Sequence, residues 1–495
     1  MQLRRLQMLS QVLRFARKKY FYLGVLILIN FVARLNRLSD PITGYYEHRA
    51  TQTAFGIKSL AETTLNPFAA EMPALGPPWK LPFEFPLYQL AAALLVRAQL
   101  FGVDQAGRII SVLSFMALAY LVFTIASAAH GQFIGLLGAV IVLFSSYGLF
   151  VGSEVLIDGL AVALSLWAYL IVHKWERIRP DLSSVALVCI AVILSALVKL
   201  NTTVIWVLGC VVLIVFNQMI KAKYKVVLTG LLGISLIPSL IWTSFADHIK
   251  SQNRYTQWLV SSELNDWYFG TIKDRFEFTS ISNSLSKFTE ATVGGTTCLV
   301  VLIFFAFLDA KKRVFTLSLL TVLVSGPLIF VRLYNIHSYY WIAVLPAAVL
   351  LVCSGLSTIG QILARYFELQ RVQVASVFLT SCLIFSTYLS KSGSEYINLF
   401  VYRRPIPVSS YVITENTEPN DLIIVLGDDW SPATLYFSGR RGLTLRPGAP
   451  KLLVSELRTT YKYVYSWEND PAWGDYFPAG FKFVEVGEHL YQIAE

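Results

Sequence analysis

Charged residues are scarce in this sequence. Only 15% of its 495 residues are Asp, Glu, Lys or Arg, whereas about a quarter is usual for a soluble domain. Hydrophobic residues make up 55%, and most of them lie in blocks of roughly 15–25 residues, the length needed to cross a hydrocarbon core of about 30 Å. The composition therefore excludes an ordinary soluble domain and predicts an α-helical polytopic membrane protein.

Cysteine is also rare. The sequence has five cysteines, all inside apolar blocks: Cys189, Cys210, Cys298, Cys353 and Cys382. Because none lies in a polar loop, the placement excludes a disulfide framework and a CxxC metal pair. It is typical of buried cysteines that act as small hydrophobic side chains.

Common motifs for nucleotides and metals are absent. We find no GxGxxG, no Walker loop, no HExxH and no DxD in the sequence. The formal charge of +10 could indicate nucleic acid, but the basic residues cluster between apolar blocks, where they set the orientation of membrane helices. We therefore expect no nucleic-acid partner. We assign no metal ligand, because the two candidate acids described below do not by themselves make a divalent site. A divalent metal cofactor stays an open alternative.

The first 19 residues are basic and precede the apolar run Phe21–Val32. A signal peptide begins in the same way, but Arg34 and Arg37 follow the run and no small-residue cleavage site is present. We interpret residues 1–19 as a cytoplasmic basic segment and the run as a retained first span. About eleven spans are expected in all, near residues 20–37, 108–128, 133–151, 157–173, 183–200, 202–218, 225–245, 294–309, 314–331, 339–356 and 373–390.

One further apolar stretch, Phe85–Phe101, could be a span or a helix on the membrane surface. Basic clusters should lie on the cytoplasmic side. They occur at Arg14–Lys19, Lys174–Arg179, Lys221–Lys225, Lys311–Arg313 and Arg365–Arg371. All five share one side only if Phe85–Phe101 does not span, and Arg97 in mid-membrane would cost about 2.5–3.5 kcal/mol. We therefore predict surface helices in a first outer loop, residues 38–107.

Because successive spans place their loops on alternate sides of the membrane, the same assignment puts the loop 246–293 and the C-terminal tail on the outer side. Residues 20–395 are predicted to form a transmembrane catalytic domain, and residues 396–495 a small extracytoplasmic α/β domain. Short β-type runs, separated by turn signals such as GDD and SGRRG, predict its strands. These runs are Leu422–Leu426, Thr434–Phe437, Tyr461–Tyr465 and Phe481–Val486.

Two acidic residues are candidates for catalysis on the outer side. Glu47 lies with His48 and Arg49 in the segment GYYEHRATQTA, just after the first span; the alternative is a solvated helix start. Asp158 lies at the start of a later span, where an acid is costly and usually marks a site. Alternatively, the helix macrodipole favours Asp158 and Glu154 simply as acids near a helix N-terminus.

Cations and aromatic residues accompany these acids. Lys199 lies between two apolar blocks and is either a site residue or a lysine that reaches to the membrane surface. The other candidates are Arg332, His337, Tyr339 and Tyr340 around a short outer loop, and Lys80 and Glu84 in the Pro-rich segment LGPPWKLPFEFPLYQL. Such a set suits transfer of a sugar from a lipid phosphate. Cations stabilise the departing phosphate, a carboxylate takes the acceptor's proton, and aromatic rings suit apolar sugar faces.

The order of these features resembles the GT-C superfamily of membrane glycosyltransferases, and within it the protein O-mannosyltransferase and lipid A aminoarabinose transferase branch. The resemblance rests on four features in this order: a basic N-terminal segment followed by one span, the segment E-H-R-x-x-Q-T-A, a Pro-rich segment with Lys and Glu, and an Asp at the outer start of a later span. It covers most of residues 15–390. It implies a GT-C fold, a polyprenyl-phosphate sugar donor and inverting transfer.

The resemblance also implies roles for single residues. Glu47 matches the acid of the first outer loop, although a neighbour could be the base instead, and Asp158 matches the second acid. Lys80 falls near the position of a phosphate-contacting lysine but out of register with it. Arg332 and His337–Tyr340 fall where relatives contact the donor phosphate.

The sequence thus predicts an enzyme of a bacterial-type inner membrane that transfers a sugar to the hydroxyl of a lipid, glycan or protein acceptor, in contact with membrane lipids. Glu47 would be the general base, with Asp158 orienting the acceptor or Arg49. One alternative is a transporter or flippase for lipid-linked sugars, which typically shows inverted repeats and broken helices at mid-membrane. Another is a polysaccharide ligase or acyltransferase, which would depend on Arg and His more than on the acids.

Overall fold

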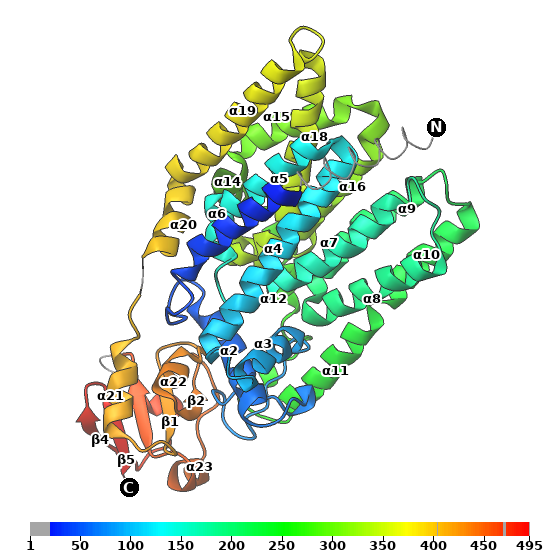
Figure 1. Ribbon diagram of the computed structural model, residues 1–495. Coiled ribbons are helices and arrows are strands. Elements are labelled where there is room, and N and C mark those ends of the chain that lie inside the picture. The colour runs from blue at the N-terminus through cyan, green and yellow to red at the C-terminus, as the bar shows by residue number, and fades with distance from the viewer. Residues whose placement is uncertain (1–19, 403, 469–471, 495) are drawn as a thin grey trace.

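The protein is a bundle of helices with a small α/β domain at one end (Figure 1). The computed structural model describes residues 20–402, 404–468 and 472–494, so the predicted cytoplasmic segment, residues 1–19, lies outside the described residues. The first helix is Tyr20–Leu35. The helices that follow are α2 (Glu47–Glu62), α3 (Leu87–Arg97), α4 (Val103–His130), α5 (Gln132–Phe144), α6 (Ser146–Val151), α7 (Asp158–Lys174), α8 (Leu182–Val198), α9 (Leu200–Phe216), α10 (Ala222–Ile234) and α11 (Ile237–Ser251).

The second half of the bundle begins with short elements in the large outer loop. They are η2 (Gln257–Leu259), α12 (Asn265–Phe269) and α13 (Ile272–Phe276). The remaining elements are α14 (Phe278–Val293), α15 (Thr296–Leu308), η3 (Ala310–Lys312), α16 (Arg313–Ile329), α17 (Val331–Ile336), η4 (Ser338–Ala343), α18 (Leu345–Leu363), α19 (Leu369–Leu389) and α20 (Lys391–Val401).

Among the described residues, five helices are long and apolar enough to cross a membrane, or six if the bent pair α14 and α15 counts as one. The five are Val103–His130, Ala222–Ser251, Ala310–Ile329, Leu345–Leu363 and Leu369–Leu389. Four further predicted spans coincide with shorter apolar helices: Tyr20–Leu35, Gln132–Phe144, Leu182–Val198 and Leu200–Phe216. The number of spans, about eleven, therefore stays a prediction.

Four predicted spans differ from the structure in their bounds or continuity. The stretch 339–356 begins as the 3-10 helix η4 and continues as α18 from Leu345 to Leu363, and the stretch 225–245 is divided into α10 and α11. The stretch 133–151 breaks at Ser145, whose side chain accepts a hydrogen bond from the Gly148 N–H and so starts α6 as a separate helix. The stretch 294–309 begins only at Thr296, because Gly294 and Gly295 have positive φ angles of 82° and 113°. Glycine tolerates this conformation, and α14 and α15 meet there at 74°.

The ambiguous stretch Phe85–Phe101 forms the short helix α3. At about 1.5 Å per residue, its 11 residues are too short to cross a hydrocarbon core of about 30 Å. Arg97 at its end donates hydrogen bonds to the carbonyl oxygens of Ala61 and Thr63 (3.0 and 2.9 Å). These bonds tie the end of α3 to the end of α2 and satisfy the guanidinium outside an apolar environment.

The C-terminal domain contains a five-stranded sheet in the order β2-β1-β3-β5-β4. Strands β1, β2 and β3 are parallel, and β5 runs antiparallel to β3 and β4. The strands are β1 (Leu422–Leu426), β2 (Arg441–Thr444), β3 (Tyr463–Ser466), β4 (Lys482–Gly487) and β5 (Leu490–Ala494), and the helices are α21 (Val408–Asn416), α22 (Ala433–Ser438), α23 (Val454–Thr459) and α24 (Trp473–Tyr476).

One of the four predicted strands is wrong. Thr434–Phe437 lies within helix α22, where Pro432 precedes the helix and the Ser431 side chain accepts a hydrogen bond from the Ala433 N–H (3.3 Å). These start signals outweigh the β-type composition. The other three runs match β1, β3 and β4 within two residues at each end.

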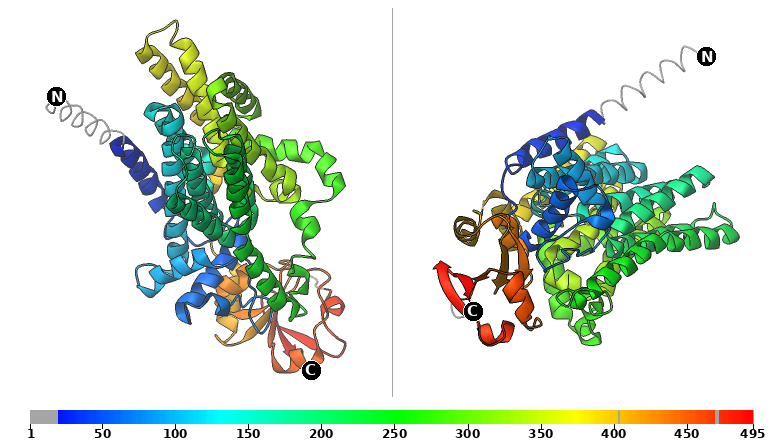
Figure 2. Two further views of the ribbon diagram at one scale, coloured as in Figure 1. Left: turned by 90° about the vertical axis from the view of Figure 1, so that its right-hand side faces the viewer. Right: turned by 90° about the horizontal axis from the view of Figure 1, so that it is seen from below.

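Strand β2 attaches the C-terminal domain to the first outer loop. The N–H groups of Gly442 and Thr444 donate hydrogen bonds to the carbonyl oxygens of Pro73 and Ala74 (3.0 and 2.8 Å), and the Tyr436 hydroxyl on α22 donates to Asp104 (2.5 Å). Figure 2 shows the domain from two further directions, next to the blue helices at one end of the bundle. The sheet edge is thereby covered and the domain is held against α2.

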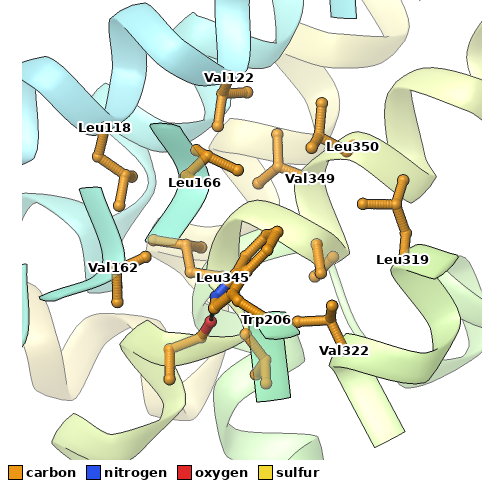
Figure 3. Packing of buried hydrophobic residues seen from close by; sticks show 14 of the residues in the cluster. Leu118, Val122, Val162, Leu166, Trp206, Leu319, Val322, Leu345, Val349 and Leu350 are labelled. Carbon is orange, nitrogen blue, oxygen red and sulfur yellow. Dashed lines mark hydrogen bonds between the residues drawn. The ribbon is translucent and has the colours of Figure 1, made fainter. Parts of the chain in front are cut away.

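The hydrophobic core lies in the middle of the bundle. Figure 3 shows Trp206 of α9 among aliphatic side chains of α7, α16 and α18, including Val322 and Leu345. The Trp206 indole N–H donates to the Ala343 carbonyl (2.9 Å), so its polar atom is satisfied. This core places the starts of α7, α9 and α18 beside one another at the end of the bundle that faces the C-terminal domain.

The ends of the bundle differ in charge as the loop pattern predicts. The turns between α9 and α10 and between α18 and α19, which carry the basic clusters Lys221–Lys225 and Arg365–Arg371, lie at the end opposite α2, α3 and the C-terminal domain (Figure 1). Under the rule that basic clusters stay in the cytoplasm, α2 and α3 face outward. The orientation itself remains a prediction.

Candidate active site

Lys199 is the buried cation of the candidate site. It separates α8 from α9 with an extended backbone (φ −162°, ψ 99°), so the break between the helices directs its side chain inward. Its Nζ donates to Asp158 Oδ1 at 2.5 Å, and the two side chains are only 4% and 1% exposed. The other carboxylate oxygen, Asp158 Oδ2, is buried and has no hydrogen-bond partner among the described residues.

Two tyrosines form a wall over this pair. The Lys199 ammonium lies 4.2 Å from the ring centroid of Tyr340 and 5.1 Å from that of Tyr339. Their rings stack on each other at 4.6 Å, and His337 stacks on Tyr339 at 5.3 Å. Cation–π attraction strengthens when the cation is desolvated, as Lys199 is here.

A second ion pair joins α2 to the Pro-rich segment. Arg49 NH2 donates to Glu84 Oε1 at 2.6 Å. Burial alone would lower the pKa of Arg49, but attraction to Glu84 raises it above its ordinary value. Burial would likewise raise the pKa of Glu84, and the charges of Arg49 and Lys199 lower it instead. Both groups are therefore charged at neutral pH.

These two pairs form one electrostatic unit, which we call the ionic centre: Asp158, Lys199, Arg49 and Glu84. Lys199 interacts with both Arg49 and Glu84 across the centre. His48 and His337 lie at its edge, where burial and then the neighbouring cations lower the pKa of each imidazole. Both histidines are thus neutral at neutral pH and can accept a hydrogen bond.

Glu47 lies apart from the ionic centre. No hydrogen bond or ion pair between described residues joins it to Asp158. It accepts a long hydrogen bond from the Gly44 N–H (3.4 Å), and its electrostatic partners are Arg404, in the link between the domains, and Asp428. Burial is the main cause that raises the pKa of Glu47, and Arg404 opposes it.

Two predicted phosphate-binding residues lie at the margin. Lys80 is exposed and follows the segment that pairs with β2 of the C-terminal domain. Arg332 lies over the ring of Trp267 at 5.8 Å, and Trp267 in turn contacts His337 at 5.5 Å between ring centroids. Arg332 therefore lies beside the aromatic residues that border His337.

Sequence reasoning missed the residues that the C-terminal domain contributes. Trp430 contacts His48 (4.4 Å between centroids), Trp258 (5.5 Å) and Phe83 (5.9 Å). Asp428 precedes it in the loop after β1, at the carboxyl end of a parallel strand. Ligands of α/β domains commonly bind at such strand ends, so the segment GDDW after β1 carries a signal for a ligand site as well as for a turn.

A buried polar network holds the acid-bearing segments together. Arg37 forms an ion pair with Glu154 (3.1 Å), and Arg108 donates to the carbonyl oxygens of Arg37 and Pro41 (both 2.9 Å). Arg37 precedes α2, and Glu154 precedes Asp158. The network therefore fixes the start of the first outer loop relative to the start of α7.

Within the described part of the chain, no group of three or more His, Cys, Asp or Glu residues is arranged to hold a metal ion. Asp158 and Glu84 are instead paired with cations, and the neighbouring acids Glu47 and Asp428 come from two different domains.

The architecture is that of the GT-C membrane proteins, as the resemblance implied. The apo structure of ArnT from Cupriavidus metallidurans, a lipid A aminoarabinose transferase, matches with a TM-score of 0.65 at 11% identity, over 96% of this chain and 97% of that one. ArnT bound to undecaprenyl phosphate matches with the same TM-score at 10% identity, covering 95% and 97% of the two chains.

A more distant match extends the same fold. The apo oligosaccharyltransferase of Archaeoglobus fulgidus matches with a TM-score of 0.50 at 12% identity, over 90% of this chain and 69% of that one. No protein family and no curated protein matches at the level of sequence. At these identities the likeness establishes the fold, and the activity must be argued from the site.

Proposed function

We propose that this protein transfers a sugar from a polyprenyl-phosphate donor to an acceptor hydroxyl, with inversion, at the extracytoplasmic face of a bacterial-type inner membrane. The observation that carries the proposal is the ionic centre, in which a buried cation, Lys199, and a half-buried one, Arg49, lie beside aromatic rings at one end of a GT-C bundle. ArnT, which shares the fold, binds undecaprenyl phosphate. The fold gives no support to the transporter alternative.

The cations would stabilise the leaving group. In the proposed step the acceptor oxygen forms a bond to the anomeric carbon, the bond from that carbon to the phosphate oxygen breaks, and polyprenyl phosphate leaves as an anion. Lys199 and Arg49 would hold its charge, with His337 and Tyr340 as further contacts. Fixed charges at a water-poor site stabilise developing charge without reorganisation.

Glu47 is the proposed general base. A base works best when its pKa lies near the working pH, and burial raises the pKa of Glu47 whereas Arg49 and Lys199 lower that of Glu84. Glu84 would instead position Arg49. Asp158 would position Lys199, and its unpartnered Oδ2 could orient the acceptor.

The acceptor would approach Glu47 from the C-terminal domain. His48, Trp430 and Asp428 line that side, and aromatic and carboxylate side chains suit a hydroxyl-bearing acceptor. The acceptor could be a lipid, a glycan or a protein. The domain would then help to bind the acceptor while the ionic centre binds the donor.

The test is transfer from radiolabelled polyprenyl-phosphate sugars by the purified protein. Glu47→Gln should lower the rate by about 10²–10⁴-fold, the usual contribution of a general base. Glu62→Gln, an exposed acid at the other end of the same helix, is the matched control and should transfer normally.

The Asp158→Asn variant needs a second comparison, because it leaves Lys199 buried without its partner. Loss of one member of a buried ion pair costs about 3–5 kcal/mol of stability. The double variant Asp158→Asn, Lys199→Met should recover thermal stability but remain inactive. Transfer at the rate of the unmodified protein by both Glu47→Gln and Asp158→Asn would show that the site assignment is wrong.

A further inference from the structure

A cluster of hydroxyl groups lies beside the ionic centre, and the proposed reaction step does not use it. Its middle member is Ser338, the first residue of η4. The Tyr46 hydroxyl lies 2.7 Å from Ser338 Oγ, and the Tyr147 hydroxyl donates to the Ser338 carbonyl oxygen (2.8 Å). The two tyrosines are only 5% and 0% exposed, so these hydrogen bonds lie in surroundings of low dielectric, where they are strong.

This hydroxyl cluster joins segments that are far apart in the chain. Tyr46 precedes α2, Tyr147 belongs to α6 and Ser338 begins η4. Tyr396 of α20 completes the cluster, because its hydroxyl is a further hydrogen-bond partner of Ser338 and Tyr46 and its ring lies 5.2 Å from that of Tyr147. Four elements are therefore fixed to one another around a single serine.

The Tyr46 side chain is directed away from the helix that Tyr46 begins. Residues at this position usually bond to the free N–H groups of their own helix. Among the described residues, however, the Tyr46 side chain makes no capping hydrogen bond to α2. It bonds instead to Ser338, 292 residues further along the chain. Its hydroxyl therefore serves a contact between two distant segments and not the local stability of α2.

The two segments carry the two halves of the proposed reaction. Tyr46 is the residue before Glu47, the proposed general base. Its ring meets Tyr339 edge-on at 5.3 Å, and the ring centroid of Tyr339 lies 5.1 Å from the Lys199 ammonium. Ser338 directly precedes Tyr339. The hydrogen bond between Tyr46 and Ser338 thus connects the segment of the base with the segment that lines the proposed phosphate site.

We propose that Tyr46 and Ser338 are positioning residues, whose hydrogen bond fixes the separation between the general base Glu47 and the phosphate site beside Tyr339 and Lys199. The inference rests on the proposed function. Inverting displacement needs the acceptor oxygen, the anomeric carbon and the leaving oxygen in line, so the groups that act on the two oxygens must be held at one separation. A misplacement of about 1 Å can lower a rate about a hundredfold.

The test measures transfer and binding with the full-length protein in detergent. Tyr46→Phe and Ser338→Ala each remove one hydroxyl, and kcat should fall about ten- to a hundredfold, while binding of polyprenyl phosphate stays unchanged. Because both residues act through one hydrogen bond, the double variant should be no slower than the slower single variant. Ser338→Thr keeps the hydroxyl and should keep most of kcat.

A second tyrosine–serine pair provides the matched control. The Tyr169 hydroxyl on α7 lies 2.5 Å from Ser318 Oγ on α16, and Tyr169 is fully buried in the core of the bundle. Tyr169→Phe removes the same kind of hydrogen bond, so it should lower thermal stability about as much as Tyr46→Phe does. Its kcat should equal that of the unmodified protein.

The outcomes separate this inference from the proposed function. Three results would overturn the inference and leave glycosyl transfer intact: Tyr46→Phe and Ser338→Ala proteins with an unchanged kcat, a kcat that falls equally in Tyr169→Phe, or losses that multiply in the double variant. If Tyr46→Phe does not fold, the comparison of Ser338→Ala with Ser338→Thr decides. No transfer by the unmodified protein from any polyprenyl-phosphate sugar would overturn both.

Discussion

At the scale of single residues, the site pairs almost every buried charge with an opposite one. Asp158 with Lys199 and Arg49 with Glu84 are matched at 2.5 and 2.6 Å. Desolvated charges without partners are expensive, so the pairs keep the cations charged and in place before a substrate arrives. Asp428 is different, because its carboxylate approaches another acid, Glu47, across the two domains.

Asp428 should make stability depend on pH. Burial first, and then the charges of Glu47 and of Asp429 in the same loop, raise its pKa to about 7, while a hydrogen bond from Thr434 opposes the shift; Tyr465 on β3 also faces it. The folded protein therefore holds a proton that the unfolded chain releases at lower pH. The stabilising contribution is present below the ordinary carboxyl pKa and is lost as pH rises through about 7.

Thermal unfolding measured between about pH 5 and pH 8 checks this prediction. The unmodified protein should lose stability across that range, and Asp428→Asn, which is neutral throughout, should lose less. Asp475→Asn replaces an exposed acid on α24 and should keep the unmodified profile. An Asp428→Asn curve parallel to that of the unmodified protein would contradict the assignment.

At the scale of elements, helix α2 connects the parts of the site. Its successive residues Glu47, His48 and Arg49 point in different directions, because a helix turns by about 100° per residue. Glu47 and His48 meet the C-terminal domain, and Arg49 meets the ionic centre. Phe55, two turns further on, packs against Tyr436 of α22 (5.1 Å between ring centroids), which holds the domain against this helix.

Disrupting the hydrogen bonds between β2 and the first outer loop should therefore weaken transfer and leave the ionic centre unchanged. A Cβ on Gly442 would lie 1.8 Å from the Ile423 carbonyl oxygen, so Gly442→Ala should distort β2 and its hydrogen bonds to the first outer loop. We expect faster proteolysis of the C-terminal domain and a several-fold rise in the acceptor KM.

The matched control is Gly474→Ala, since nothing lies within 4 Å of a Cβ at that position. Binding of polyprenyl phosphate should stay the same in both variants, because the ionic centre belongs to the bundle. If the acceptor KM of Gly442→Ala were unchanged although its domain was cleaved faster, the domain would have no part in acceptor binding.

At the scale of the whole molecule, the site lies at one end of the bundle and the basic turns lie at the other (Figure 1). The proposed lipid-linked donor would require a site near the membrane surface, and the charge pattern predicts that this surface faces outside the cell. The orientation is the part of this arrangement that the fold alone does not determine.

Labelling of introduced cysteines tests the orientation. In intact cells, a membrane-impermeant maleimide should label Asp475→Cys in the C-terminal domain and leave Lys223→Cys, in the first turn of α10, unlabelled until the membrane is opened. The unmodified chain, whose five cysteines lie in apolar segments, gives the background. The reverse labelling pattern would place the site in the cytoplasm.

The sequence by itself predicted a mostly helical chain with a GT-C architecture and a short helix at Phe85–Phe101 that is not a span, because apolar block length and loop charge are local properties that the chain displays directly. The pairing of Asp158 with Lys199 and of Arg49 with Glu84 was decided only by the tertiary structure, since the partners lie 41 and 35 residues apart on elements whose contact depends on the packed core. The same holds for Trp430 and Asp428, which reach α2 because β2 pairs with the first outer loop, a contact between distant segments that no local pattern encodes.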